Sequence, residues 1–280
     1  MSQLKQREGP ISPSRDLGLA REAYAVGDVE LMVAAHDKAH GADEKHAGEA
    51  GEFIKSLVFG GLDGIITTFA IVSAALGANL GYKTVVVMGL ANLIADAISM
   101  GLGDALSEKA ELDYTMREYR REQWEFDENQ EGEVREMIEL YMAKGIAQED
   151  AEEILQRMVK YREFFLSHMM NVELGLLTPD GDEDPWKKGG VTFLAFIIFG
   201  SIPLISYIGF AAVPGNTPAA LFGYCIVFTG AAIFVLGVVK GKFAQADAVS
   251  SGLLMLVNGC LAAAASFLIG WGLDQLVVSE

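Results

Sequence analysis

The most constraining feature of this 280-residue chain is a series of long apolar stretches that carry almost no charge. They occupy residues 56–80, 84–106, the two halves of 189–239 on either side of the Pro214–Pro218 turn, and residues 248–273. Each stretch is long enough for a helix that crosses about 30 Å of hydrocarbon. Because other backbone conformations in lipid leave polar groups unsatisfied, the stretches predict five transmembrane α-helices.

The charge of the protein is concentrated elsewhere. The chain holds 21 Lys and Arg against 38 Asp and Glu, a formal net charge of −17, although 51% of its residues are hydrophobic. Residues 104–188 alone hold 23 acidic and 11 basic side chains, a net charge of −12. This balance excludes a nucleic-acid surface, which needs clustered Lys and Arg, and it favours cations as partners. The chain has no Walker A loop and no nucleophile elbow, so we expect a protein that is not an enzyme.

These patterns predict an all-α polytopic membrane protein with four regions. Residues 1–50 form a polar segment, 51–106 hold two spans, 107–188 form an acidic helical metal-binding domain, and 189–280 hold three spans. Basic residues flank the cytosolic ends of spans and so decide the orientation. Lys83 lies alone on one side, and the lysines on the other side are Lys45, Lys55, Lys109, Lys187, Lys188, Lys240 and Lys242. We therefore expect a cytosolic amino terminus, a cytosolic acidic domain and a lumenal carboxyl terminus.

Two carboxylates within the predicted spans are functional candidates, because an ionisable side chain among apolar neighbours is costly to insert. Asp63 lies in the first span, between glycines, and Asp96 lies in the second. Asn92, Asp96 and Met100 are spaced four apart, which places an amide, a carboxylate and a thioether on one helix face. A buried carboxylate pair can exchange protons for a divalent cation, the minimum chemistry of an antiporter. The alternative is a polar contact between packed helices, with Met100 filling a gap.

Glycine pairs four residues apart predict close helix contacts, either within one subunit or across a dimer. The pairs are Gly60/Gly64, Gly77/Gly81 and Gly237/Gly241.

The acidic domain repeats the ligand chemistry of the spans. Residues 104–128 extend the second span as a helix, and further helices are predicted over 133–144 and 149–177. Carboxylate and thioether side chains recur there three or four residues apart, so that they point in one direction. These residues are Glu122, Glu125, Glu133, Glu136, Met169, Met170 and Glu173. Oxygen ligands suit Mg²⁺, Ca²⁺ or Mn²⁺, and a thioether shifts the preference toward softer first-row ions such as Fe²⁺. Taken singly, each glutamate is more often a solvated surface residue, and spacing alone does not decide between the two.

Several motifs together resemble the vacuolar iron transporter family. The resemblance covers roughly residues 45–275 and includes the alternation of two spans, an acidic helical insert and three spans. The motifs are Asp63-Gly64, Gly89-Leu-Ala91, Ala97-Ile-Ser-Met-Gly-Leu-Gly103, Met169-Met-x-x-Glu-Leu-Gly-Leu176 and Gly200-x-Ile-Pro-Leu-Ile205.

The resemblance implies a homodimeric exchanger of the vacuolar membrane, without a resident cofactor. It would move Fe²⁺, and Mn²⁺ or related ions, out of the cytosol in return for protons. The family's pore aspartate and methionine correspond to Asp63 and Met100, and its soluble metal ligands correspond to the seven glutamates and methionines above. The family commonly has a glutamate where this chain has Asn92. Because an amide exchanges no proton, either Asp96, one turn along, takes that role or the proton coupling differs.

Two other classes of function remain open at this stage. The first is a metal-gated divalent-cation channel, in which the acidic domain senses the ion and the pore conducts passively. The second is a membrane-anchored metal buffer or carboxylate oxidase. The absence of Glu-x-x-His motifs disfavours an oxidase, and five spans exceed what an anchor needs.

Overall fold

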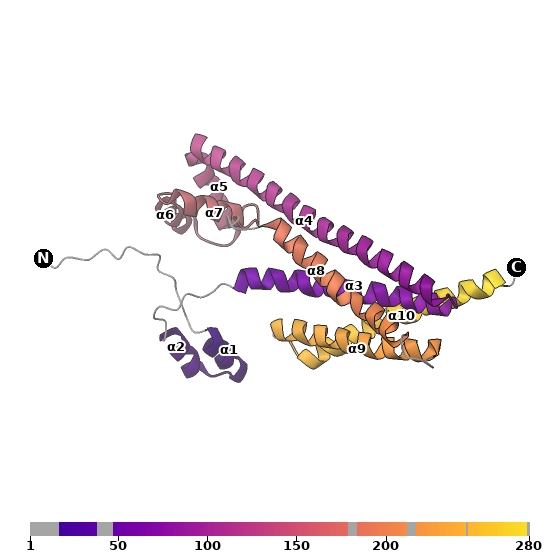
Figure 1. Ribbon diagram of the computed structural model, residues 1–280. Helices are drawn as coiled ribbons and strands as arrows, with labels where there is room; N and C mark the ends of the chain where they lie inside the picture. Colours follow the sequence, from indigo (N-terminus) through magenta and orange to yellow (C-terminus); the bar gives the residue numbers. More distant parts are fainter. Residues whose placement is uncertain (1–16, 38–46, 179–183, 212–216, 245, 279–280) are drawn as a thin grey trace. The chain divides into compact units, whose positions relative to one another are not determined.

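Every regular element in the described part of the chain is an α-helix (Figure 1). The computed structural model describes residues 17–37, 47–178, 184–211, 217–244 and 246–278. The chain divides into two units, Met1–Ala50 and Gly51–Glu280. The first unit contains α1 (Leu17–Val26) and α2 (Val29–Asp37), joined through Gly27. Gly27 has a φ of 70°, a left-handed conformation that glycine adopts without steric cost.

Five helices are long and apolar enough to cross a membrane. They are α3 (Ala47–Gly77), α4 (Tyr82–Glu128), α8 (Pro185–Ala211), α9 (Pro218–Phe243) and α10 (Ala248–Val278). Their order along the chain, two helices, an insert and three helices, is the order that the apolar stretches predict. The prediction of an all-α polytopic membrane protein is confirmed.

The helix α4 is much longer than a membrane is thick. Its 47 residues span about 70 Å at 1.5 Å per residue, against about 30 Å for the hydrocarbon core. Its second half therefore forms the first helix of the acidic domain, as predicted from the lack of Pro and Gly in residues 104–128. The helix packs along α8, which lies beside it in Figure 1.

Small residues let the membrane helices approach closely. A Cβ added at Gly60 or Gly64 of α3 would lie 2.6 Å from the backbone oxygen of Thr192 or Phe196 of α8, so only glycine fits at either position. Gly81 makes no such contact within the chain: it lies in the turn before α4, where a Cβ would meet nothing within 4 Å.

In the acidic domain, two short helices pack against the end of α4, and a third packs against those two. They are α5 (Gln130–Ala143), α6 (Gln148–Met158) and α7 (Arg162–Val172). Their shared apolar core consists of Phe126, Met137, Leu155, Phe165, Leu166 and Met169.

The prediction of one helix over 149–177 is wrong, because the segment folds as α6 and α7. Tyr161, which precedes α7, has a φ of −112° and a ψ of 79°, outside the helical region. Its side chain is exposed, whereas Leu155 and Phe165 on either side of the break are buried. Apolar spacing continues across the break, and for that reason periodicity did not reveal it.

Candidate metal centre and membrane carboxylates

Three glutamates from separate parts of the sequence converge in the acidic domain. Glu122 lies on α4, Glu133 lies on α5, and Glu173 directly follows α7. Each offers one carboxylate oxygen, and the three oxygens lie within 4.8 Å of one another. One divalent cation can contact oxygens at such separations, because metal–oxygen bonds measure about 2.0–2.6 Å. We call these residues the glutamate cluster.

The turn between α4 and α5 brings two members of the cluster together. Asn129 ends α4 and caps α5, its side-chain oxygen accepting a hydrogen bond of 3.2 Å from the backbone N–H of Gly132. Such a cap satisfies one of the free donors at a helix start. A Cβ at Gly132 would collide with the Asn129 side chain, so a larger residue would disturb this turn. The reversal places the first turn of α5, which carries Glu133, against α4, which carries Glu122.

Two members of the cluster are buried, and Glu173 is half-buried. The side chain of Glu122 is fully buried and that of Glu133 is 9% exposed. One oxygen of Glu122 and one of Glu173, each named Oε2, are buried and have no hydrogen-bond partner among the described residues. Buried carboxylate oxygens without partners are rare in proteins, because their desolvation is uncompensated. An all-oxygen cluster with two such atoms has the chemistry to hold a divalent cation.

The electrostatics of the cluster favour bound protons when no metal is present. Burial, reinforced by the negative charges of Glu122, Glu136 and Glu133, raises the pKa of Glu173 to about 7. Burial likewise raises the pKa of Glu133, and the charges of Glu122, Glu125 and Glu136 add to the shift. The pKa of Glu122 is raised by burial as well, although a hydrogen bond from Arg121 opposes the change. Because a metal must displace these protons, binding and protonation compete.

The other four predicted ligands lie on α4, α5 and α7, the helices that position this cluster. Glu125 and Glu136 are more exposed, and their charges act on Glu122 and Glu133. Met169 and Met170 are fully buried, and Met169 packs within the apolar core of the domain. The backbone N–H of Glu173 donates to the carbonyl of Met169, which keeps the carboxylate one helical turn from that thioether. The structure thus brings three of the seven residues close together, and the other four lie on the same helices outside that group.

The predicted membrane residues also lie near one another. The amide nitrogen of Asn92 donates to Oδ2 of Asp96 at 2.6 Å, which confirms that the two side chains share a face of α4. Asp63 of α3 lies close enough to Asp96 for their charges to interact. Met100 is half-buried and packs against the apolar core formed by the membrane helices. The role of these four residues in transport stays a prediction.

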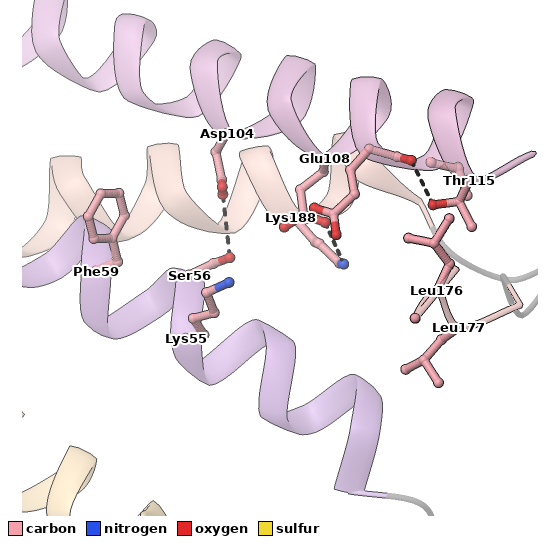
Figure 2. Close-up of a pocket in the computed structure, with 12 residues that line it drawn as sticks. Lys55, Ser56, Phe59, Asp104, Glu108, Thr115, Leu176, Leu177 and Lys188 are labelled. Carbon is pink, nitrogen blue, oxygen red and sulfur yellow. Dashed lines mark hydrogen bonds and ion pairs between the residues drawn. The ribbon is translucent and has the colours of Figure 1, made fainter. Parts of the chain in front are cut away.

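A cavity lined by both charged and apolar side chains lies between the membrane helices and the acidic domain (Figure 2). Its volume is about 530 Å³, and α3, α4, α8 and the segment after α7 line it. On one side, Oδ2 of Asp104 accepts hydrogen bonds from Thr192 at 2.5 Å and Ser56 at 3.4 Å. Farther along α4, Glu108 forms an ion pair of 2.8 Å with Lys188 of α8. These bonds tie α3, α4 and α8 together where α4 leaves the apolar region.

The sequence profile of the VIT family matches residues 54–271. This chain belongs to the VIT family. The vacuolar iron transporter of Toxoplasma gondii is 41% identical over 94% of this chain and 90% of that protein. The vacuolar iron transporter of Plasmodium falciparum is 38% identical over 90% and 94% of the two chains, and vacuolar iron transporter 1 of Arabidopsis thaliana is 33% identical over 80% and 87%. The family resemblance carried by the sequence motifs is confirmed.

The region that matches the VIT family contains all eleven residues predicted for the pathway and the metal centre. Sequence reasoning missed Arg121, whose guanidinium contacts Glu118, Glu122 and Glu125. The spacing of Glu118 and Glu125 at −3 and +4 from Arg121 was a usable signal, because such neighbours lie within reach on a helix. The contact with the adjacent Glu122 does not follow from spacing. Sequence reasoning also assigned no role to Asp104, although this carboxylate interrupts the apolar stretch 84–106 near its carboxyl end.

Proposed function

We propose that this protein transports Fe²⁺ from the cytosol into the vacuole in exchange for protons, with Mn²⁺ and other divalent first-row metals as further substrates. The observation that carries the proposal is the glutamate cluster, with its two buried, unpartnered oxygens. Membership of the VIT family supports iron as the metal, since the relatives are named vacuolar iron transporters.

The first step is capture of the ion by the acidic domain. Glu122, Glu133 and Glu173 supply oxygen ligands. The more exposed Glu125 and Glu136, at the rim of the cluster, attract the cation by their charge. Met169 and Met170 add thioethers, which favour Fe²⁺ over Mg²⁺ or Ca²⁺. The metal replaces protons held by glutamates of raised pKa, so capture releases protons on the same side.

The second step is passage across the membrane at Asp63 and Asp96. Two neighbouring carboxylates in an apolar region repel each other unless a proton or a cation lies between them. Metal and protons therefore occupy the pair alternately, which is the condition for exchange. Asn92 holds Asp96 in place through its amide, and Met100 offers a thioether farther along the same helix.

The proposal includes an orientation and an oligomeric state. The lysine distribution supports a cytosolic acidic domain and a lumenal carboxyl terminus. A homodimer is proposed from the family resemblance.

The test is Fe²⁺ uptake into proteoliposomes that contain the purified full-length protein, with a pH-sensitive dye inside. An acidic interior should accelerate uptake over vesicles of equal internal and external pH, and the internal pH should rise as Fe²⁺ enters. Protein-free vesicles treated in the same way give the background.

Flux that does not depend on the pH gradient, with no internal pH change, would contradict exchange and indicate a passive channel. Metal binding without any flux would indicate a buffer instead. Parallel assays with Mn²⁺, Co²⁺ and Zn²⁺ determine which metals are carried.

A further inference from the structure

Arg121 uses three atoms of its guanidinium to contact three glutamates of α4. Nη1 lies 2.8 Å from Oε2 of Glu118, and Nη2 lies 2.8 Å from Oε1 of Glu122. Nε lies 3.6 Å from Oε2 of Glu125. A planar guanidinium suits this arrangement, because its donors spread in a fixed fork.

The contact with Glu122 differs from an ordinary surface ion pair. Arg121 is 47% exposed, but the Glu122 side chain with which it pairs is fully buried. Exposed pairs contribute little to stability, whereas a buried charge depends strongly on its partner. Arg121 occupies Oε1 of Glu122 and leaves Oε2 without a hydrogen-bond partner, so the carboxylate is held while one oxygen stays available.

Arg121 also opposes the accumulated negative charge of the whole centre. Its charge acts on Glu122, Glu133 and Glu173, the three members of the glutamate cluster. Among the described residues, Arg121 is the basic side chain whose charge lowers the pKa of all three glutamates. Without it, the glutamates around the cluster would repel one another with no fixed cation between them.

We propose that Arg121 is the resident counter-cation of the metal centre: it holds the glutamates together while no metal is bound, and it keeps metal binding reversible. This inference rests on the proposed metal-binding function of the cluster and concerns the regulation of that same site. A bound metal ion neutralises part of the negative charge that Arg121 balances in its absence. Repulsion between the ion and the guanidinium then favours release of the ion. A transport protein needs both properties, because an ion held too tightly does not move on.

The test compares Arg121→Gln with Arg120→Gln in the full-length protein in detergent, with Co²⁺ as the probe. Arg120 is the preceding residue on the same helix and is exposed, so its change removes the same charge at a different place. The metal-free melting temperature and its rise on addition of Co²⁺ are measured, together with the Co²⁺ dissociation constant from calorimetry.

Arg121→Gln should lower the metal-free melting temperature more than Arg120→Gln does, and Co²⁺ should raise it by more than it raises that of the wild type. The dissociation constant should fall roughly three- to thirtyfold, the effect of removing one unit charge near the ion. Equal behaviour of the two variants would overturn the inference. Weaker Co²⁺ binding in Arg121→Gln would also overturn it, because Arg121 would then serve to orient Glu122 for the metal.

If Arg121→Gln does not fold even with Co²⁺, Arg121→Leu replaces it, because leucine also removes the charge but keeps an apolar side chain that packs along the helix and offers no metal ligand. Its Co²⁺-induced rise in melting temperature must exceed that of the wild type, and an equal rise overturns the inference. Absence of Co²⁺ binding by the wild type is a different result, since it refutes the proposed metal-binding function itself.

Discussion

Carboxylate oxygens of Glu122 and Glu173 lie within 4.8 Å of each other, although α4 carries the first residue and the second follows α7. Glu122 also shares its helix with Asp96, since α4 runs unbroken from Tyr82 to Glu128. The two positions on α4 are about 39 Å apart at 1.5 Å per residue. One stiff helix therefore connects the metal centre with the membrane carboxylates, and a shift at either end can be transmitted to the other.

Replacing Glu122 by Gln should weaken metal binding while preserving the shape of the side chain. The amide cannot supply the negative charge of a buried carboxylate ligand, so Co²⁺ affinity should fall roughly ten- to a hundredfold, as expected for loss of one charge-assisted contact. Calorimetric titration of the full-length protein measures this. Glu139→Gln, on an exposed position of α5, is the matched control and should bind like the wild type. Unchanged affinity in Glu122→Gln would remove Glu122 from the metal centre.

The stability of the metal-free protein should depend on the protonation of Glu173. Its folded-state pKa of about 7 lies above the ordinary value of 4.5, so the folded protein binds this proton more tightly than the unfolded chain. The resulting stabilisation is complete below about pH 4.5 and is lost as the pH rises through about 7. Over the same interval metal affinity should increase, because fewer protons compete.

Melting temperatures recorded from pH 5 to pH 8, with and without Co²⁺, test this pH dependence. Glu173→Gln is the informative comparison, since glutamine does not titrate. The variant should lose less of its metal-free stability than the wild type as the pH rises. Identical pH profiles for the two proteins would contradict the raised pKa.

Asp63→Ala should abolish Fe²⁺ transport and leave expression and metal capture by the acidic domain intact. The substitution removes one of the two interacting carboxylates on the proposed pathway. Asp274→Asn, at the far end of α10, removes a carboxylate elsewhere on a membrane helix and should transport normally. Uptake into proteoliposomes is the measurement, and a wild-type rate in Asp63→Ala would exclude this residue from the pathway.

Asn92→Glu should keep transport active and shift its pH dependence. The change replaces the amide that bonds Asp96 with a third titratable group, the residue type that the family commonly has there. Asn92→Gln keeps an amide and should retain the wild-type pH profile. Complete loss of transport in Asn92→Glu alone would mean that a neutral donor beside Asp96 is required.

The membrane architecture could be predicted from the sequence because its cause is local. Each stretch without charge must form a helix, since lipid offers no partner for free backbone groups. The spacing of Asn92 and Asp96 within one helix was likewise enough to predict that they share a face, on which the structure shows them hydrogen-bonded. The break at Tyr161 escaped prediction, because the apolar residues on both sides keep a helical spacing across it.

The metal centre was predicted only as separate residues. Spacing identified the glutamates, but it did not distinguish Glu122, which is buried, from Glu125 at the rim. That difference depends on how α5 and α7 pack against α4, which follows from the turn at Asn129 and the apolar core of the domain. The sequence by itself thus determined the five spans, the acidic insert and the set of residue types available for binding cations. Only the tertiary structure decided which carboxylates meet and where Arg121 balances them, because burial and contact between distant segments are set by packing rather than by spacing.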